Sequence, residues 1–235
     1  MTDMNPERYT RQTMLAGFGD AGQRLLASKR VIVIGAGGLG SAALVYLAGA
    51  GVGHITIVDA DVVSLSNLQR QVLYSEAQVG ESKAAHAAAR LRELNSEVEV
   101  EAVARFLTAE NAEALIAGHD LLLDCTDNFV TRYLIDDACA AIGTPWVYAS
   151  IGEFAGQLAV FNGAAGTRYR DLYGEREELC GRPKPVLGVL GAVAGVMGAM
   201  QAGEAVKYML GLGENLDGRL FTIDLLSYNT MTINI

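Results

Sequence analysis

The chain has 235 residues, of which 51% are hydrophobic and 19% are charged, and its formal net charge is −9. This composition supports a large core and excludes a disordered chain, and the acidic balance argues against a general nucleic-acid partner. The cysteines Cys125, Cys139 and Cys180 include no C-x-x-C pair, so neither a disulfide framework nor a cysteine zinc site is expected. The first residues show no apolar secretory segment, so we expect a cytoplasmic protein with reduced thiols.

Residues 1–30 precede the first predicted strand and contain a helical pattern near Ala21 to Ala27. Arg8 and Arg11 lie before that helix. On the sequence pattern alone, both arginines could be solvated, or they could reach a phosphate group in this subunit or in a neighbouring one.

A glycine-rich turn follows the first predicted strand, Val31 to Ile34, and a helical pattern begins at Ser41. Gly35, Gly37 and Gly40 form G-x-G-x-x-G between a strand and a helix, which is the context that this motif requires. Gly35 is expected to make the tight turn, Gly37 to admit a phosphate, and Gly40 to let the helix approach the sheet. The motif predicts a nucleotide site but does not separate dinucleotides from ATP.

Acidic and amide side chains follow the second predicted strand, Ile55 to Val58. Asp59 lies where a ribose-binding carboxylate is expected, roughly 20 residues after the glycines. The polar segment Val62 to Tyr74 comes next, beyond the carboxyl end of that strand. Open α/β sheets bind their ligands at this edge.

A predicted helix from Glu81 to Asn95 carries Lys83 in its first turn. A cation at this position opposes the helix dipole. Lys83 is therefore either an ordinary surface lysine or a residue that meets an anion.

Strands and helices continue to alternate up to Ser150, which predicts a Rossmann-like, mostly parallel sheet with helices on both faces. After Gly152 the pattern predicts a strand, a polar loop at about 163–184, a long buried helix, and closing strands that extend the sheet in antiparallel fashion. The long helix contains too short an apolar stretch for a membrane span. We expect one domain over residues 1–235, with an N-terminal helical segment (1–30), a nucleotide-binding half (31–150) and a C-terminal half (151–235) containing the mobile loop. The remaining predicted elements are strand 98–103, helix 109–117, strand 121–124, helix 129–142, strand 146–150, strand 157–161, helix 186–210, and strands 219–224 and 230–235.

Three polar clusters follow strands, at Asp59 to Asp61, at Asn67 to Gln71, and at Asp124 to Asn128. In a dinucleotide oxidoreductase, the cations Arg70 and Lys83 and a second acidic cluster would be surplus. In ATP chemistry the two cations would stabilise phosphate charge, and a carboxylate after the third strand could hold Mg²⁺. The three histidines are scattered along the sequence and are interpreted as surface or strand-edge residues.

The chain resembles the ThiF/MoeB/HesA family, bacterial relatives of ubiquitin-activating enzymes, from Arg8 to about Ile223. Five blocks carry the resemblance: Arg8-Tyr9-x-Arg11-Gln12, Gly35-x-Gly37-Gly38-Leu39-Gly40, Asp59-x-Asp61-x-Val63-x-x-Ser66-Asn67-Leu68-x-Arg70-Gln71, Lys83, and Asp124-Cys125-x-Asp127-Asn128.

The resemblance implies adenylation of the C-terminal glycine carboxylate of a small ubiquitin-like sulfur carrier of the ThiS or MoaD type, with ATP and Mg²⁺. Pyrophosphate would be released, and the pathway would be thiamine or molybdopterin biosynthesis. Asp59 would bind the ribose. Asn67, Arg70, Gln71 and Lys83 would bind the phosphates, and Asp127 would be the magnesium or catalytic aspartate. Arg11 would reach into the site of a partner subunit, which implies a homodimer.

The chain departs from the family pattern at two places. Arg168 and Asp171 stand where many relatives carry a zinc-binding C-x-x-C pair, so no zinc is predicted and the loop should be weakly anchored. Cys180 falls near a loop cysteine that links covalently to the carrier in some relatives; here it is either that residue or a dispensable surface cysteine. Cys125 and Cys139 are interpreted as packing residues.

Other functions stay open at this point. An NAD(P)-dependent oxidoreductase would share the glycine turn and Asp59, and a non-catalytic module would dock a partner without turnover. A related branch of the family adenylates acceptors other than a carrier protein.

Overall fold

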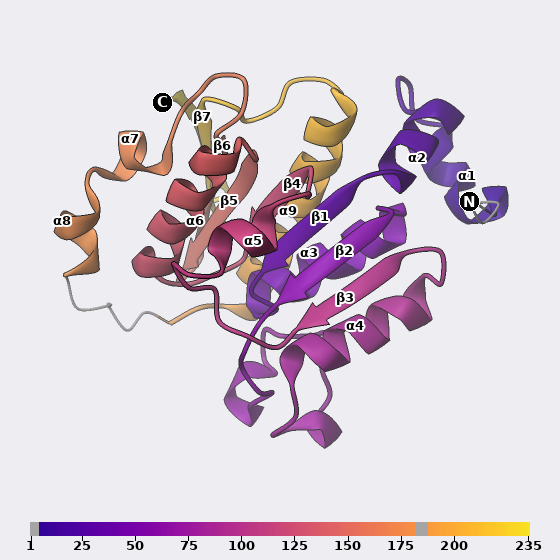
Figure 1. The fold of residues 1–235 in the computed structure, drawn as a ribbon, viewed down its shortest axis with the longest axis horizontal. Helices are drawn as coiled ribbons and strands as arrows, with labels where there is room; N and C mark the ends of the chain where they lie inside the picture. The colour runs from indigo at the N-terminus through magenta and orange to yellow at the C-terminus, as the bar shows by residue number, and fades with distance from the viewer. Residues whose placement is uncertain (1–4, 182–187) are drawn as a thin grey trace.

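A central sheet organises the computed structural model, which describes residues 5–181 and 188–235 (Figure 1). In this part of the chain the strand order is β3-β2-β1-β4-β5-β6-β7-β8. Strands β1 to β5 are parallel, and β6, β7 and β8 continue the sheet in antiparallel fashion. The strands are β1 (Arg30–Ile34), β2 (His54–Val58), β3 (Glu99–Val103), β4 (Leu121–Asp124), β5 (Trp146–Gly152), β6 (Ala155–Phe161), β7 (Arg219–Asp224) and β8 (Asn229–Asn234). The predicted fold class is confirmed.

Helices cover both faces of this sheet. One core lies between the sheet and α3, α4 and α9, and a second lies between the sheet and α5 and α6 (Figure 1). The helices are α1 (Pro6–Thr13), α2 (Gly19–Ala27), α3 (Gly38–Ala50), α4 (Lys83–Leu94), α5 (Ala112–Ile116), α6 (Phe129–Ile142), α7 (Tyr169–Tyr173), α8 (Arg176–Cys180) and α9 (Gly191–Leu210), with 3-10 turns η1 (Leu65–Asn67) and η2 (Glu76–Gln78).

The sequence of β1 explains its central position. Val31 and Val33 face the core under α3, whereas Ile32 and Ile34 face the core under α6. A strand buried on both faces reads as a continuous apolar run instead of an alternating one. The chain order changes direction between β1 and β4, and ligand sites of α/β sheets form at the carboxyl ends of the strands beside such a switch point.

Helix α1 and the start of α9 differ from the sequence expectation, and so do α7 and α8, which lie in the predicted loop. Helix α1 lies in the N-terminal segment (1–30) that was predicted to be helical, but it was not predicted as a separate helix, because it is polar and buries only Tyr9. Asn5 at its N-cap and Pro6 in its first turn are helix-start signals. Helix α9 begins at Gly191, and the start predicted at Val186 lies outside the described residues. In the described part of the chain, no helix combines the length and apolarity needed to cross a bilayer.

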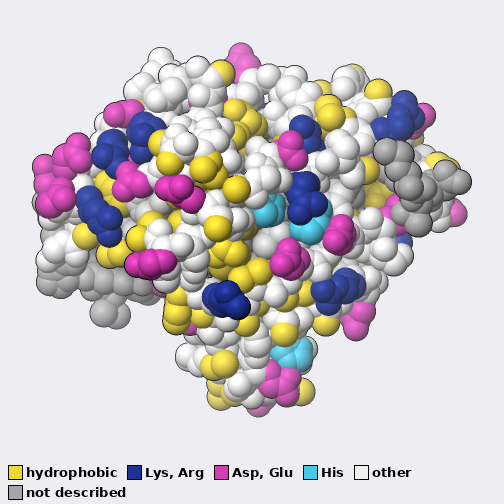
Figure 2. Space-filling model, in the orientation of Figure 1, with side chains coloured by type: hydrophobic (Ala, Val, Ile, Leu, Met, Phe, Trp, Pro, Cys, Tyr) yellow, Lys and Arg dark blue, Asp and Glu magenta, His cyan; other side chains and the backbone are white. Residues whose placement is uncertain are grey.

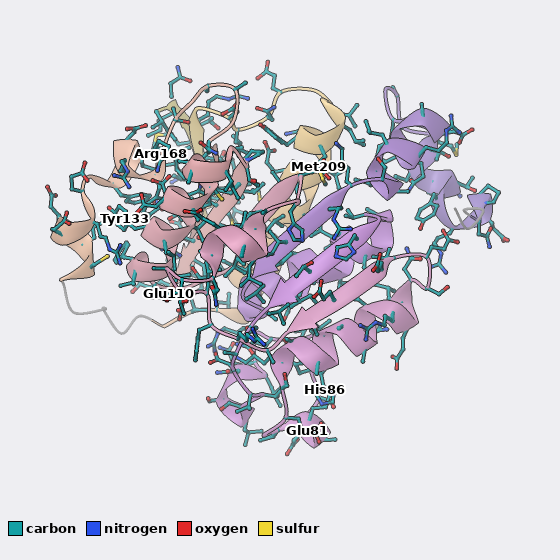
Figure 3. All side chains as sticks on the ribbon, viewed as in Figure 1. Glu81, His86, Glu110, Tyr133, Arg168 and Met209 are labelled. Carbon is teal, nitrogen blue, oxygen red and sulfur yellow. The ribbon has the colours of Figure 1, made fainter. Side chains whose placement is uncertain are left out.

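The segment after β6 is more firmly held than the sequence analysis expected. Its described part forms α7 and α8, and the buried carboxylate of Asp136 on α6 accepts hydrogen bonds from the Arg168 side chain at 2.8 and 3.0 Å (Figure 3). The same carboxylate accepts from the amide of Tyr169, whose ring is fully buried in the second core. The expectation of weak anchoring is therefore wrong for residues 168–173, because an ion pair and an aromatic ring hold them to α6.

Candidate functional site

The glycine turn, residues 35–40, connects β1 to α3 and leaves almost no room for side chains. Gly35 has φ of 96°, and a Cβ atom there would lie 2.7 Å from the carbonyl oxygen of Cys125. A Cβ atom on Gly40 would lie 2.2 Å from the carbonyl oxygen of Gly35. These contacts match the tight turn expected of Gly35 and the close helix approach expected of Gly40, and they press the turn against the end of β4.

The start of α3 offers backbone donors to an anion. Its N-cap is Gly37, which has no side chain to accept hydrogen bonds from the first amides of the helix. Unpaired amides and the positive end of the helix dipole favour a phosphate group at this position. The side chains of Gln71 and Arg70 lie beside Gly37 and Gly38, so an amide and a cation border the same turn.

The Asp59 carboxylate is tied to the glycine turn. Its Oδ2 atom accepts from the amide of Ala36 at 2.7 Å, and its Oδ1 atom accepts from the amide of Asp61 at 2.8 Å. Burial raises the pKa of Asp59, and the two backbone hydrogen bonds and the charge of Lys83 oppose that shift. Each carboxylate oxygen keeps a second lone pair that could accept from a ligand hydroxyl.

Lys83 is the first residue of α4 and is only 4% exposed. Its Nζ atom lies 3.0 Å from Oδ2 of Asp61. A buried cation at the start of a helix is unfavourable unless an anion meets it. In this structure the anion is the Asp61 carboxylate, which is largely exposed.

The segment between β2 and α4 folds back over the glycine turn. The carbonyl of Asn67 accepts from the amides of Arg70 and Gln71, which closes a compact turn. Gln71 is buried, and among the described residues no donor meets its Oε1 atom. The hydroxyl of Tyr74 donates to the carbonyl of Ala36 at 2.8 Å. The sequence analysis missed Tyr74, which is the sole aromatic residue in the predicted polar segment 62–74.

Residues 125–128 leave the end of β4 on the other side of β1. Asp127 is exposed there, and Asn128 is the N-cap of α6, because its Oδ1 atom accepts from the amide of Thr131 at 2.9 Å. The cap occupies that oxygen and leaves the NH₂ group of Asn128 to meet a ligand. Each of the three polar clusters thus has a member beside the glycine turn: Asp59 at Ala36, Gln71 at Gly37, and Cys125 at Gly35. Lys83 joins the first cluster through Asp61.

A sequence model of the ThiF family matches residues 9–235. The chain belongs to the ThiF family.

Curated relatives of this ThiF-family chain are named for two activities, adenylyltransferase and sulfurtransferase. The adenylyltransferase and sulfurtransferase MOCS3 of Drosophila sechellia is 44% identical over 229 residues, which cover 95% of this chain and 50% of that protein. The protein of the same name from Mus musculus is 47% identical over 225 residues, covering 92% of this chain and 47% of the relative. The chain spans about half the length of these relatives.

Solved structures show the same fold at low sequence identity. E. coli MccB with ATP superposes with a TM-score of 0.84 and 22% identity, covering 99% of this chain and 72% of MccB. PaaA also superposes with a TM-score of 0.84 and 22% identity, covering 100% of this chain and 75% of PaaA.

Arg11 lies far from the glycine turn of its own chain. Its neighbour Gln12 donates to the carbonyl of Ala50, at the last turn of α3, whereas the glycine turn is at the first. The 13 residues of α3 separate these points by about 20 Å. In Figure 1, α1 lies at the amino end of β1, opposite the arrowhead that leads into the glycine turn.

Cys180 is also outside the cluster of predicted site residues. It ends α8, which packs against α6 at the edge of the second core (Figure 1). Its side chain is partly exposed, whereas Cys125 and Cys139 are buried, as expected for packing residues.

Two histidines meet on the open part of the sheet, away from the glycine turn. Thr56 on β2 lies 3.1 Å from Nε2 of His54 and 2.9 Å from Nε2 of His119. Burial lowers the pKa of His119. Figure 2 shows histidine among acidic and basic side chains over this face. The histidines are scattered along the sequence, but the parallel pairing of β1 with β2 and β4 brings His54 and His119 together in the fold.

Proposed function

We propose that this chain adenylates the C-terminal glycine carboxylate of a small ubiquitin-like sulfur carrier protein, using ATP and releasing pyrophosphate. Membership of the ThiF family supports the proposal, and so do the relatives that are named adenylyltransferases. The observation that carries it is the buried Lys83 ammonium group, held at the start of α4 beside the carboxylates that border the glycine turn. A cation in this position suits a polyphosphate.

In the proposed complex the phosphates lie over the start of α3. The first amides of α3, Arg70 and Lys83 would bind and polarise them, and Asp59 would accept from the ribose hydroxyls. Asn67 and Gln71 would supply amide groups, and the unpaired Oε1 atom of buried Gln71 is available to a donor.

The reaction needs positioning and charge stabilisation more than proton transfer. A carboxylate oxygen of the carrier attacks the α-phosphorus, and the bond from that phosphorus to the oxygen bridging to the β-phosphate breaks. Pyrophosphate leaves with the electron pair, and the carrier keeps the adenylyl group as a mixed anhydride. Arg70 and Lys83 would stabilise the negative charge that grows on the leaving group.

Mg²⁺ would be held through Asp127. In proteins this ion is bound by one or two carboxylates together with substrate phosphates, so one exposed carboxylate facing the nucleotide is sufficient. Asp127 fits this requirement, because it follows β4 next to the glycine turn and is exposed. When bound, the ion would neutralise phosphate charge during transfer.

A homodimer would complete each site. Arg11 is exposed on α1 and is about 20 Å from its own glycine turn, so it can serve a nucleotide only in a second subunit. Met14 and Leu15 follow α1 and are 71% and 59% exposed, which supports a contact surface beside Arg11.

Cys180 would not take part in adenylation. Its position on α8 supports at most a later step, in which the thiolate of Cys180 attacks the acyl carbon of the mixed anhydride, a thioester to the carrier forms, and AMP leaves with the phosphate oxygen. Substitution by serine would then leave pyrophosphate exchange unchanged and abolish only the link.

Pyrophosphate exchange into ATP tests the proposal. Purified protein is assayed with Mg²⁺ and with small carriers of the ThiS and MoaD types that end in Gly-Gly. Exchange that depends on one carrier supports the proposal and identifies the pathway, thiamine or molybdopterin biosynthesis.

The alternatives give different results when the exchange assay is combined with measurements of nucleotide binding and carrier binding. Binding of NAD(P) in place of ATP would indicate an oxidoreductase. ATP binding without exchange for any carrier would direct attention to a different acceptor, and carrier docking without exchange would indicate a non-catalytic module.

A further inference from the structure

The end of β4 is held from the α9 face by one buried glutamine. The NH₂ group of Gln201 donates to the carbonyl of Asp124 at 2.8 Å and to the carbonyl of Val147 on β5 at 2.9 Å. Its Oε1 atom accepts from the thiol of Cys125 at 3.2 Å. Gln201 is fully buried, so water does not compete for these hydrogen bonds.

The same strand end is held from the opposite face by Arg132 of α6. Its guanidinium donates to the carbonyl of Thr126 at 3.0 Å, and its Nε atom lies 3.4 Å from Oδ2 of Asp124. The guanidinium carbon also lies 5.2 Å from the centre of the Tyr148 ring. The other oxygen of Asp124 accepts from the amide and the hydroxyl of Thr126, at 2.9 and 2.6 Å.

Fold stability alone gives little reason for this buried ion pair. Asp124 is fully buried and Arg132 is 6% exposed. Such a pair commonly stabilises a fold no more than apolar residues of the same size would, because both charges are desolvated. Among the described residues, Oδ2 of Asp124 and Nε of Arg132 have no hydrogen-bond partner, so the pair is also imperfectly satisfied. Because the pair is desolvated and incompletely hydrogen-bonded, we explain it by the position that it gives to the nearby backbone.

The backbone that the Arg132–Asp124 pair positions is that of residues 125–128. The carbonyl oxygen of Cys125 would lie 2.7 Å from a Cβ atom on Gly35, so the two backbones are in close contact. Asn128 is held in place as the N-cap of α6. Asp127 therefore stands between two restrained points of the backbone, and the same clamp supports the glycine turn.

We infer that Arg132 and Gln201 are positioning residues that clamp the end of β4 from both faces and thereby place Asp127 relative to the glycine turn. The inference rests on the proposed function, in which Asp127 holds Mg²⁺ at the nucleotide. Neither residue touches the reacting atoms in this account; both act through the backbone of residues 124–127.

Three variants test the clamp. Arg132→Met and Gln201→Met keep the volume of the side chain and remove the hydrogen bonds to the strand end. Arg132→Lys keeps the buried charge but has a single nitrogen, which cannot contact both the Thr126 carbonyl and the Asp124 carboxylate. It replaces Arg132→Met in the comparison with the wild type if the methionine variant does not fold. Tyr133→Phe is the matched control, because it removes a 2.8 Å hydrogen bond from the same helix to Gly174, away from β4 (Figure 3).

The first readout is hydrogen–deuterium exchange of the amides of residues 125–128 in the ligand-free protein. We expect about tenfold faster exchange in each clamp variant and no change in these amides in Tyr133→Phe. The second readout is the Mg²⁺ concentration that gives half-maximal pyrophosphate exchange at saturating ATP. We expect it to rise about tenfold in the clamp variants and to stay unchanged in the control.

The clamp is refuted if the variants lose thermal stability as the control does, while their exchange at residues 125–128 stays at the wild-type level. Failure of the proposed function gives a different pattern. The wild type would then catalyse no pyrophosphate exchange with any carrier, while hydrogen–deuterium exchange would still decide whether Arg132 and Gln201 hold the strand end.

Discussion

Lys83 and Asp61 are joined twice, once through their side chains and once through the backbone. The Nζ atom of Lys83 lies 3.0 Å from Oδ2 of Asp61, and the amide of Lys83 donates to the carbonyl of Asp61, also at 3.0 Å. The double connection ties the start of α4 to the residues that follow β2. It holds the ammonium group beyond the carboxyl end of β2, where the proposed function places the phosphates.

Lys83→Met should separate stability from activity. The ammonium group is buried at the positive end of α4, and its partner Asp61 is exposed enough to be solvated alone. We therefore expect an unchanged or higher melting temperature, together with a loss of about 10²- to 10³-fold in pyrophosphate exchange.

Lys29→Met is the control for that variant. Lys29 makes a similar 3.1 Å ion pair with Asp120 near the start of β1, at the opposite end of the sheet. Its removal should leave exchange unchanged and alter stability by less than about 1 kcal/mol. A melting temperature of Lys83→Met that falls well below that of Lys29→Met would contradict the account of Lys83.

Gly40→Ala and Gly49→Ala should have opposite effects on stability, although both lie in α3. A methyl group on Gly40 would overlap the carbonyl of Gly35 at 2.2 Å, whereas a methyl group on Gly49 meets no atom within 4 Å. We expect Gly40→Ala to lose about 3 kcal/mol or more, and Gly49→Ala to gain about 0.5–1 kcal/mol through helix propensity. Urea unfolding measures both, and equal losses would show that α3 is not pressed onto the turn as described.

Mixing two inactive variants tests whether Arg11 acts in a partner subunit. Arg11→Ala and Asp127→Ala should each abolish exchange as homodimers. After subunits are mixed and reassorted, a heterodimer has one site with both residues intact, so about a quarter of wild-type activity should return. Mixtures that stay inactive, although mass spectrometry shows heterodimers, would mean that Arg11 does not act in trans.

Asp136→Asn should loosen the segment at residues 168–173. The carboxylate of Asp136 is fully buried and accepts from Arg168, Arg170 and the amide of Tyr169. We expect a loss of about 2–4 kcal/mol in the free energy of unfolding and faster tryptic cleavage after the two arginines. Asp137→Asn is the neighbouring control, because Asp137 is half exposed and its ion pair with Arg170 should contribute less than about 1 kcal/mol. If both variants are cleaved at the same rate, the buried carboxylate is not the anchor.

The elements that the sequence predicts well are those whose signals are local. Helix α6 begins and ends where predicted, because Asn128 caps its start and Gly143 adopts a left-handed conformation at its end. The glycine turn is also local, since its residues are consecutive. In contrast, α1 buries a single side chain and therefore shows little apolar periodicity.

Contacts between distant segments could not be read from the sequence. Arg132 lies on the buried face of α6, and its partner Asp124 becomes visible only when β4 is placed beside that helix. The anchoring of Arg168 likewise depends on Asp136, which is 32 positions away. For the same reason, the pairing of His54 with His119 through Thr56 follows from the strand order and not from any motif.

The strand order also determines when the site can form during synthesis. The glycine turn packs against the carbonyl of Cys125, which is synthesised many residues after the turn. The carbonyl of Asp124 accepts a hydrogen bond from Gln201, which is synthesised 77 positions later still. Contacts this distant in sequence form late in folding. A nascent chain that stops before α9 therefore lacks the hydrogen bonds from Gln201 that hold the end of β4. If the proposed function is right, ATP binding to the nascent chain would begin only after Gln201 has left the ribosome.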